Sequence, residues 1–184
     1  ATGGTSNWGV YNSSSSSPSM NNVTATATGG TDFSTGVANF DSSSPSMNNV
    51  TATATGGIGN YGVYNTSSSP SMNNVTATAT GGTTGAGVYN SGSSSPSMNN
   101  VTATGEKIAD NGLSTAFGVY NISSSPSIRN SSITGSTKSI FNDNTSNAKV
   151  ADTALGGAVA GNGFFCVGVY DTDFAAANEV CVTP

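Results

Sequence analysis

Threonine is the residue whose spacing first suggests a chemical role. Residues 23–28 read Val-Thr-Ala-Thr-Ala-Thr, and the run returns at residues 50–55 and 75–80 and, shortened, at 101–104. In a strand this alternation places Val and Ala on the inner side and each Thr on the outer side. Each outward Thr offers a methyl and a hydroxyl group, and β-branching keeps its χ1 angle stiff. We therefore expect a preordered array that can order water.

Eleven threonines form this predicted surface: Thr24, Thr26, Thr28, Thr51, Thr53, Thr55, Thr76, Thr78, Thr80, Thr102 and Thr104.

The ionisable residues offer little catalytic chemistry. The chain has no His, four Lys and Arg, and nine Asp and Glu, so the usual general base near neutral pH is missing. Asp32 and Asp41 flank one predicted corner without a basic neighbour, and Glu106, Lys107 and Asp110 read as a solvated loop with a local ion pair. We expect no enzymatic activity, no catalytic residues, no metal site and no cofactor.

The low charge also bears on the possible partners. A net charge of −5 with four scattered cations cannot provide the cationic stripe that nucleic-acid binding needs. No apolar run has the length of a membrane span. Disordered chains usually carry many charges and few apolar residues, unlike this one. Because the chain starts at Ala rather than Met, we expect a mature, secreted product.

The threonine runs belong to an internal sequence repeat. A Gly-Val-Tyr-Asn segment at residues 9–12 returns, as Gly-Val-Ala-Asn in its second copy, at 36–39, 62–65, 87–90 and 118–121. A Ser-rich turn and then Pro-Ser-Met (Pro-Ser-Ile in the fifth copy) follow each segment. The spacing from Pro to Pro is 27, 25, 26 and then 30 residues. Such periodicity is typical of stacked repeat units, none of which can bury its apolar side alone.

Each unit is expected to contain three short strands separated by corners, and hence to build three parallel sheets. One inward column consists of Val10, Val37, Val63, Val88 and Val119, and a second of Met20, Met47, Met72, Met98 and Ile128. An Asn column at one corner is expected to adopt left-handed geometry and to bond along the stack. It consists of Asn12, Asn39, Asn65, Asn90 and Asn121.

The fold class predicted from these columns is all-β: a parallel β-helix (β-solenoid) of about five to six coils, each about 4.8 Å from the next. A flat Ser/Thr-rich sandwich is the alternative fold, and the strict register of the units argues against it. Residues 1–138 form the repeat coils, and residues 139–184 form the last coil and a capping hairpin.

The two cysteines belong to this C-terminal part. Residues 164–170 read as a strand, and residues 179–182 are expected to return antiparallel to it. A disulfide between Cys166 and Cys181, fifteen residues apart, would close that hairpin and stabilise it by about 3 kcal/mol. Two buried free thiols are the alternative. A cap is needed because an open solenoid end pairs with other molecules.

The repeat units resemble a known group of proteins. Tyr-Gly-Val-Tyr-Asn at residues 61–65, Ser-Pro-Ser-Met-Asn-Asn-Val-Thr at 69–76 and the ending from Cys166 to Cys181 are similar to bacterial right-handed parallel β-helix proteins of the pectate-lyase-like type. The resemblance implies a right-handed coil. The Thr-x-Thr rows resemble the faces of β-solenoid antifreeze proteins, which implies a monomer that adsorbs to an ice or ordered-water surface.

Other functions stay open at this stage. Stacked Thr rows suit any polar solenoid sheet, so a non-catalytic bacterial surface, adhesin or structural module is the main alternative. Carbohydrate binding and lyase activity are less favoured. The aromatic side chains near the Gly-Val strand are expected to pack against the coil, and stacking on sugars is their alternative role. These aromatics are Trp8, Tyr11, Tyr61, Tyr64, Tyr89, Phe117 and Tyr120.

Overall fold

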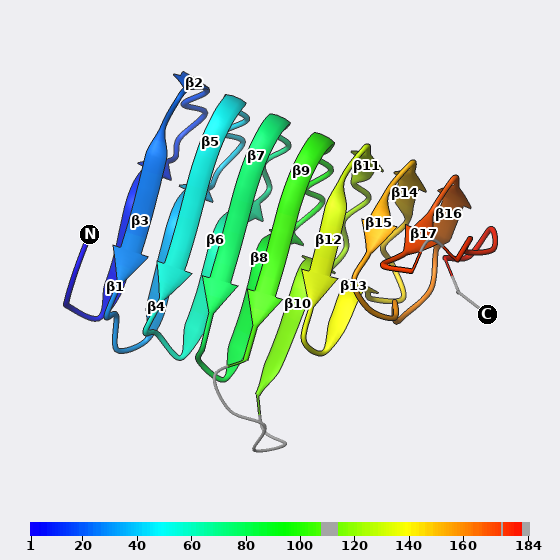
Figure 1. The fold of residues 1–184 in the computed structure, drawn as a ribbon. Helices are drawn as coiled ribbons and strands as arrows, with labels where there is room; N and C mark the ends of the chain where they lie inside the picture. Colours follow the sequence, from blue (N-terminus) through cyan, green and yellow to red (C-terminus); the bar gives the residue numbers. More distant parts are fainter. Residues whose placement is uncertain (108–113, 174, 182–184) are drawn as a thin grey trace.

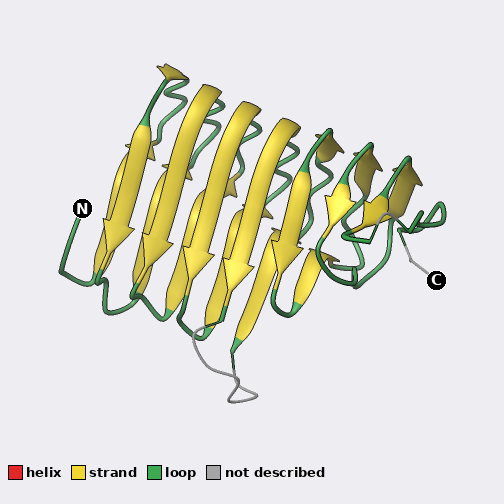
Figure 2. Ribbon diagram, in the orientation of Figure 1, coloured by secondary structure: helices red, strands yellow, loops and turns green. Residues whose placement is uncertain are grey.

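The structure, a computed structural model, describes residues 1–107, 114–173 and 175–181, and every regular element in these ranges is a β-strand (Figure 2). Successive coils stack from the N-terminal to the C-terminal end (Figure 1). All the pairings between the named strands are parallel. The predicted parallel β-solenoid is therefore confirmed. Asp110 and Val182 lie outside the described residues.

One sheet is built from the Gly-Val segments. It has six strands, one from each of the first six coils. In order they are β1 (Ser6–Asn12), β4 (Phe33–Asn39), β6 (Gly59–Thr66), β8 (Thr84–Ser91), β10 (Thr115–Asn121) and β13 (Lys138–Asn142). We call this the Gly-Val sheet.

The other sheet carries the Met and Thr segments, and we call it the Thr sheet. It has eleven strands. They are β2 (Ser19–Asn21), β3 (Thr24–Thr28), β5 (Ser46–Thr55), β7 (Ser71–Thr80), β9 (Ser97–Glu106), β11 (Ser127–Arg129), β12 (Ser132–Gly135), β14 (Ala148–Ala151), β15 (Ala154–Leu155), β16 (Phe164–Val167) and β17 (Tyr170–Asp171).

The expectation of three separate sheets is wrong. The Met and Thr segments of the three middle coils run on as the single ten-residue strands β5, β7 and β9, so that only two sheets form. Each coil bends the Thr sheet at one residue with positive φ. These residues stack in register: Asn22, Asn49, Asn74, Asn100, Asn130, Asp152 and Gly168. Asn, Asp and Gly tolerate this conformation best.

The expected left-handed geometry of the Asn12 column is also wrong, because no residue of that column has positive φ. Its side chains instead point into the solenoid and form a ladder of amide hydrogen bonds. Each Nδ2 donates to the Oδ1 of the next coil, from Asn12 through Asn39, Asn65, Asn90 and Asn121 to Asn142, at 2.8–2.9 Å. The expected bonding along the stack is confirmed.

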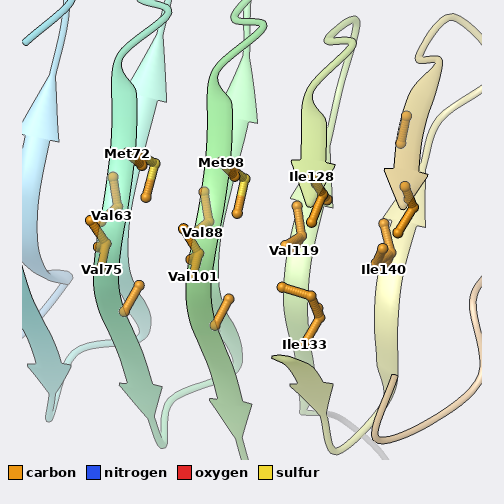
Figure 3. Close-up of a cluster of buried hydrophobic side chains, with 14 of the residues drawn as sticks. Val63, Met72, Val75, Val88, Met98, Val101, Val119, Ile128, Ile133 and Ile140 are labelled. Carbon is orange, nitrogen blue, oxygen red and sulfur yellow. The ribbon is translucent and has the colours of Figure 1, made fainter. Parts of the chain in front are cut away.

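The apolar core consists of columns of like residues. Val63 and Val88 face a Met and a Val of the Thr sheet at their own level, and Val119 faces Ile128 and Ile133 (Figure 3). Both predicted inward columns are buried, apart from the half-buried Val10 of the first coil. Because each coil repeats its neighbour's side chains, a narrow interior is filled without large residues.

The C-terminal end differs from the expected antiparallel hairpin. Strand β16 pairs in parallel with β14, so it continues the solenoid, and only one isolated antiparallel bridge, Tyr170 to Ala176, follows it. Cys166 occupies the inward Met column beside Val150. Its disulfide to Cys181, with a Cα–Cα distance of 5.5 Å, confirms the predicted pairing.

The segment after β17 caps the last coil. The N–H of Cys166 donates to the carbonyl of Glu179 at 3.0 Å, and the carbonyl of Val169 accepts from the N–H of Ala177 at 2.7 Å. Two backbone groups of the last coil, which an uncovered solenoid end would leave open to another molecule, are thus paired within the chain.

The buried ladder of Asn side chains should contribute more to the free energy of unfolding than the exposed Asn ladders do. Replacing Asn65 with Ala leaves the Nδ2 of Asn39 and the Oδ1 of Asn90 unpaired in the interior, which should lower the free energy of unfolding by about 2–4 kcal/mol. The matched control is Asn73→Ala, because Asn73 bonds equivalently to Asn48 and Asn99 but is exposed. The control should change stability by less than about 1 kcal/mol, since water replaces the lost partners. Urea unfolding of both variants measures the difference, and equal losses would contradict the account.

Asp143 gives the fold a pH dependence. Desolvation disfavours its charged form, but hydrogen bonds from the Ser146 and Thr145 hydroxyls and from the backbone N–H groups of Ser123 and Thr145 outweigh this and lower its pKa to about 2. A carboxylate with a lowered pKa stabilises the fold above its unfolded pKa of about 3.9, and this stabilisation is lost as the pH falls toward about 2.

The substitution Asp143→Asn should therefore lower the melting temperature at neutral pH. The difference from the parent protein should shrink steadily below about pH 4. Thermal melts followed by circular dichroism between neutral pH and about pH 2 measure this difference. A gap that stays constant across the range would show that the carboxylate charge has no part in it.

Candidate functional site

The threonine array extends across four strands of the Thr sheet. Residues of β3, β5, β7 and β9 pair directly, so that each outward Thr lies beside the Thr of the next coil. The first file consists of Thr24, Thr51, Thr76 and Thr102. The middle file consists of Thr26, Thr53, Thr78 and Thr104. The third file consists of Thr28, Thr55 and Thr80. Figure 1 shows these strands side by side on one face of the solenoid.

The in-and-out alternation of these strands agrees with the sequence. In β7 the inward Ala77 and Ala79 are fully buried, whereas Thr76 is exposed and Thr78 is partly exposed. The other coils show the same alternation. Thr53, Thr78 and Thr104 of the middle file are partly exposed, as are all three threonines of the third file, whereas the first file is exposed throughout.

The other sheet supports the middle file from behind through glycine. A Cβ atom added to Gly62 would lie 2.6 Å from the backbone nitrogen of Thr78. The same close approach, at 2.5–3.0 Å, occurs in four more coils: Gly9 to Thr26, Gly36 to Thr53, Gly87 to Thr104 and Gly118 to Thr134. Only Gly lets the two sheets come this close. The repeated Gly thus sets the depth at which each middle-file Thr lies.

The edges of the array are not visible from the repeat alone. The fifth coil extends the first file with Ser132 and the middle file with Thr134. At the other end, Thr2 bridges to Thr28 and lengthens the third file. The signal for Thr134 was present in Ile-Thr-Gly at residues 133–135, which aligns with Ala-Thr-Gly of the coil before.

One charge borders the surface. Glu106 pairs with Thr80 and so occupies the position after Thr80 in the third file. The first and middle files contain no charged residue on β3, β5, β7 and β9, whereas the third file meets this carboxylate. The uncharged area therefore has one defined corner at which a carboxylate replaces Thr.

The carboxylates of the second coil do not converge. Asp32 and Asp41 lie beyond opposite ends of β4, a strand of seven residues. Such a strand is about 23 Å long, so the two carboxyl groups cannot act on one substrate bond. Within the described ranges, no three His, Cys, Asp or Glu side chains gather as metal ligands would. The part of the chain that the structure describes also contains no helix able to cross a bilayer.

Comparison of the chain with protein-family models, curated proteins and solved structures finds no match. The solenoid assignment therefore rests on the strand register itself. The pectate-lyase-like and antifreeze resemblances, and with them the right-handed coil, stay predictions.

The Gly-to-Thr contact can be tested directly. Gly62→Ala forces a methyl group against the backbone of Thr78 and should lower the free energy of unfolding by about 1–3 kcal/mol. Gly85→Ala is the matched control. Gly85 lies in the same sheet as Gly62, but a Cβ added to it would meet no atom closer than 3.5 Å. Urea unfolding compares the two. A loss in the control as large as that in Gly62→Ala would show that the close approach of the sheets is not the cause.

Proposed function

We propose that the protein binds ice by adsorption through the threonine files of the Thr sheet. The observation that carries the proposal is the unbroken register of the middle file, in which five threonines lie side by side from Thr26 to Thr134. Each presents one methyl and one hydroxyl group to solvent.

A regular surface needs regular spacing in two directions. Neighbouring coils are about 4.8 Å apart, and alternate residues along a strand are about 6.6–7 Å apart. The files therefore form a two-dimensional lattice of hydroxyl and methyl groups. Water bound to such a lattice is held in a repeating pattern, which can join the surface layer of an ice crystal and block growth at that point.

The rigidity of the threonine files also supports the proposal of ice binding. Stiff χ1 angles hold each Thr, the ladder of buried asparagine amides fixes the coil register, and the glycine contacts fix the depth of the middle file. A surface ordered before binding loses little conformational entropy on adsorption.

The charge distribution also supports the proposal. Residues 1–105 carry only two charged side chains, Asp32 and Asp41, and neither belongs to the Thr sheet. A fixed charge binds its own hydration shell and would disturb an ordered water layer. Glu106 lies at the edge of the array, where it limits the area without dividing it.

We further propose that the protein acts as a monomer outside the cell. The Cys166–Cys181 disulfide is typical of proteins in oxidising compartments, and the paired C-terminal edge disfavours end-to-end association there.

The test is thermal hysteresis of the purified protein and of variants in the middle file. Thr78→Tyr and Thr53→Tyr place a bulky ring in the centre of the array and should reduce hysteresis to a small fraction of the parent value. The fold should be retained, because both side chains point outward, and circular dichroism checks this.

The control is Ser71→Tyr. Ser71 is exposed on the same strand, β7, but beyond the bend at Asn74. This variant should keep the parent hysteresis. Absence of hysteresis in the parent protein would overturn the proposal and favour a structural or adhesive module. An equal loss in Ser71→Tyr would show that the threonine files are not the contact surface.

A further inference from the structure

The outer face of the Gly-Val sheet, opposite the threonine files, carries a continuous row of aromatic rings. Tyr11, Phe40, Tyr64, Tyr89, Tyr120 and Phe141 follow one another with ring centroids 4.7–5.4 Å apart. Most of these rings are half-buried against their neighbours, as the sequence predicted. The row departs from the pattern at the second coil.

At the second coil a small side chain takes the place of a ring in the neighbouring column. The pairing places Thr35 between Trp8 and Tyr61, where the flanking coils both carry large rings. The result is a slot of about 190 Å³, open to solvent and lined by Trp8, Phe33, Thr35, Phe40, Tyr61 and Tyr64. Thr35 is itself only 3% exposed and lies at the base of the slot, whereas Ala86, the other small residue of this column, is fully buried in the cluster of Tyr61 and Phe117.

We propose that this slot binds a quaternary ammonium group, such as the trimethylammonium head of choline. Five aromatic rings line it, and aromatic faces attract such cations through the ring quadrupole. Trp8 and Phe33 leave 44% and 48% of their surfaces exposed, whereas Tyr61 at 8% forms the inner wall. The ligand would thus enter between two accessible rings and rest on a buried one.

The column register sets the width of the opening. Trp8 and Tyr61 are two coils apart in one column, so their backbones are separated by about 9.6 Å. Thr35 lies midway in the column, so a cation above it is flanked by the rings of both neighbouring coils, and aromatic faces attract cations within about 6 Å of a ring centroid.

Charge favours a cation over a neutral ligand. The first 105 residues contain no Lys, Arg or His, and their only charged side chains are Asp32 and Asp41. These two exposed aspartates directly adjoin the slot residues Phe33 and Phe40 in sequence. Five of the six lining side chains are aromatic, and a sugar stacked on them would also need polar groups placed to hydrogen-bond its hydroxyls.

The single Trp makes the test direct. Trp8 is the only Trp of the chain and lines the slot, so its fluorescence should change saturably on titration with choline chloride at constant ionic strength. The neutral isostere 3,3-dimethylbutan-1-ol should give a change at least several-fold weaker. Equal responses to the two compounds, no saturation with choline, or a response to glucose alone would each overturn the proposal.

Variants locate the response. Thr35→Tyr fills the gap with the residue that the third coil carries at this position and should abolish the choline response while leaving the circular dichroism spectrum intact. Phe33→Ala should weaken it several-fold. Phe165→Ala, at an exposed Phe on β16 at the far end, should not change it. An unchanged response in Thr35→Tyr would overturn the assignment to this slot.

A second experiment distinguishes the two possible sources of the quaternary ammonium group, a lipid headgroup and a free solute. Co-sedimentation with phosphatidylcholine vesicles, lost in Thr35→Tyr, would identify the lipid headgroup as a ligand. Choline binding without vesicle binding would identify a free solute. The slot and the threonine files lie on opposite sheets, so failure of this test leaves ice adsorption untouched, and the reverse also holds.

Discussion

Parallel backbone pairing between coils holds each residue beside its counterpart in the next coil, and the rest of the structure depends on this register. A residue type chosen once by the repeat becomes a column: valine and methionine in the interior, asparagine in the buried amide ladder, threonine on the outer face. Columns of identical side chains pack with identical contacts at every level, which permits a narrow solenoid with a small apolar core.

The same register makes the two outer faces opposite in chemistry. Behind the threonine files the interior is reduced to Ala and Gly, so that the sheets touch backbone to backbone and the outer surface is set by the main chain. On the Gly-Val sheet, side chains as large as Tyr project outward and pack against one another along the stack. The threonine face carries small side chains and almost no charge. The opposite face carries a row of aromatic rings that the slot interrupts at the second coil.

Departures from the repeat are where the columns acquire special properties. Glu106 ends one threonine file, Thr35 opens the aromatic wall, and Cys166 places a disulfide in the column that elsewhere holds Met. In the second coil Ala38 also replaces Tyr, and the ring of Phe40 fills the row in its place, at 5.4 Å from Tyr11 and 5.3 Å from Tyr64. A perfect repeat would have none of these local features.

The sequence by itself determined the solenoid, the inward Val and Met columns, the outward threonines and the Cys166–Cys181 pair, because period-two alternation and repeat spacing are local signals. Only the tertiary structure decided where the chain bends. The left-handed residues are Asn49 and Asn74 and their equivalents rather than the buried Asn65, since either Asn suits a bend and only the stacked coil shows which one faces a closed interior. The placement of Thr134, Thr2 and Glu106 at the edges of the array likewise depends on strand register where the repeat weakens, and register is a property of the paired coils rather than of one of them.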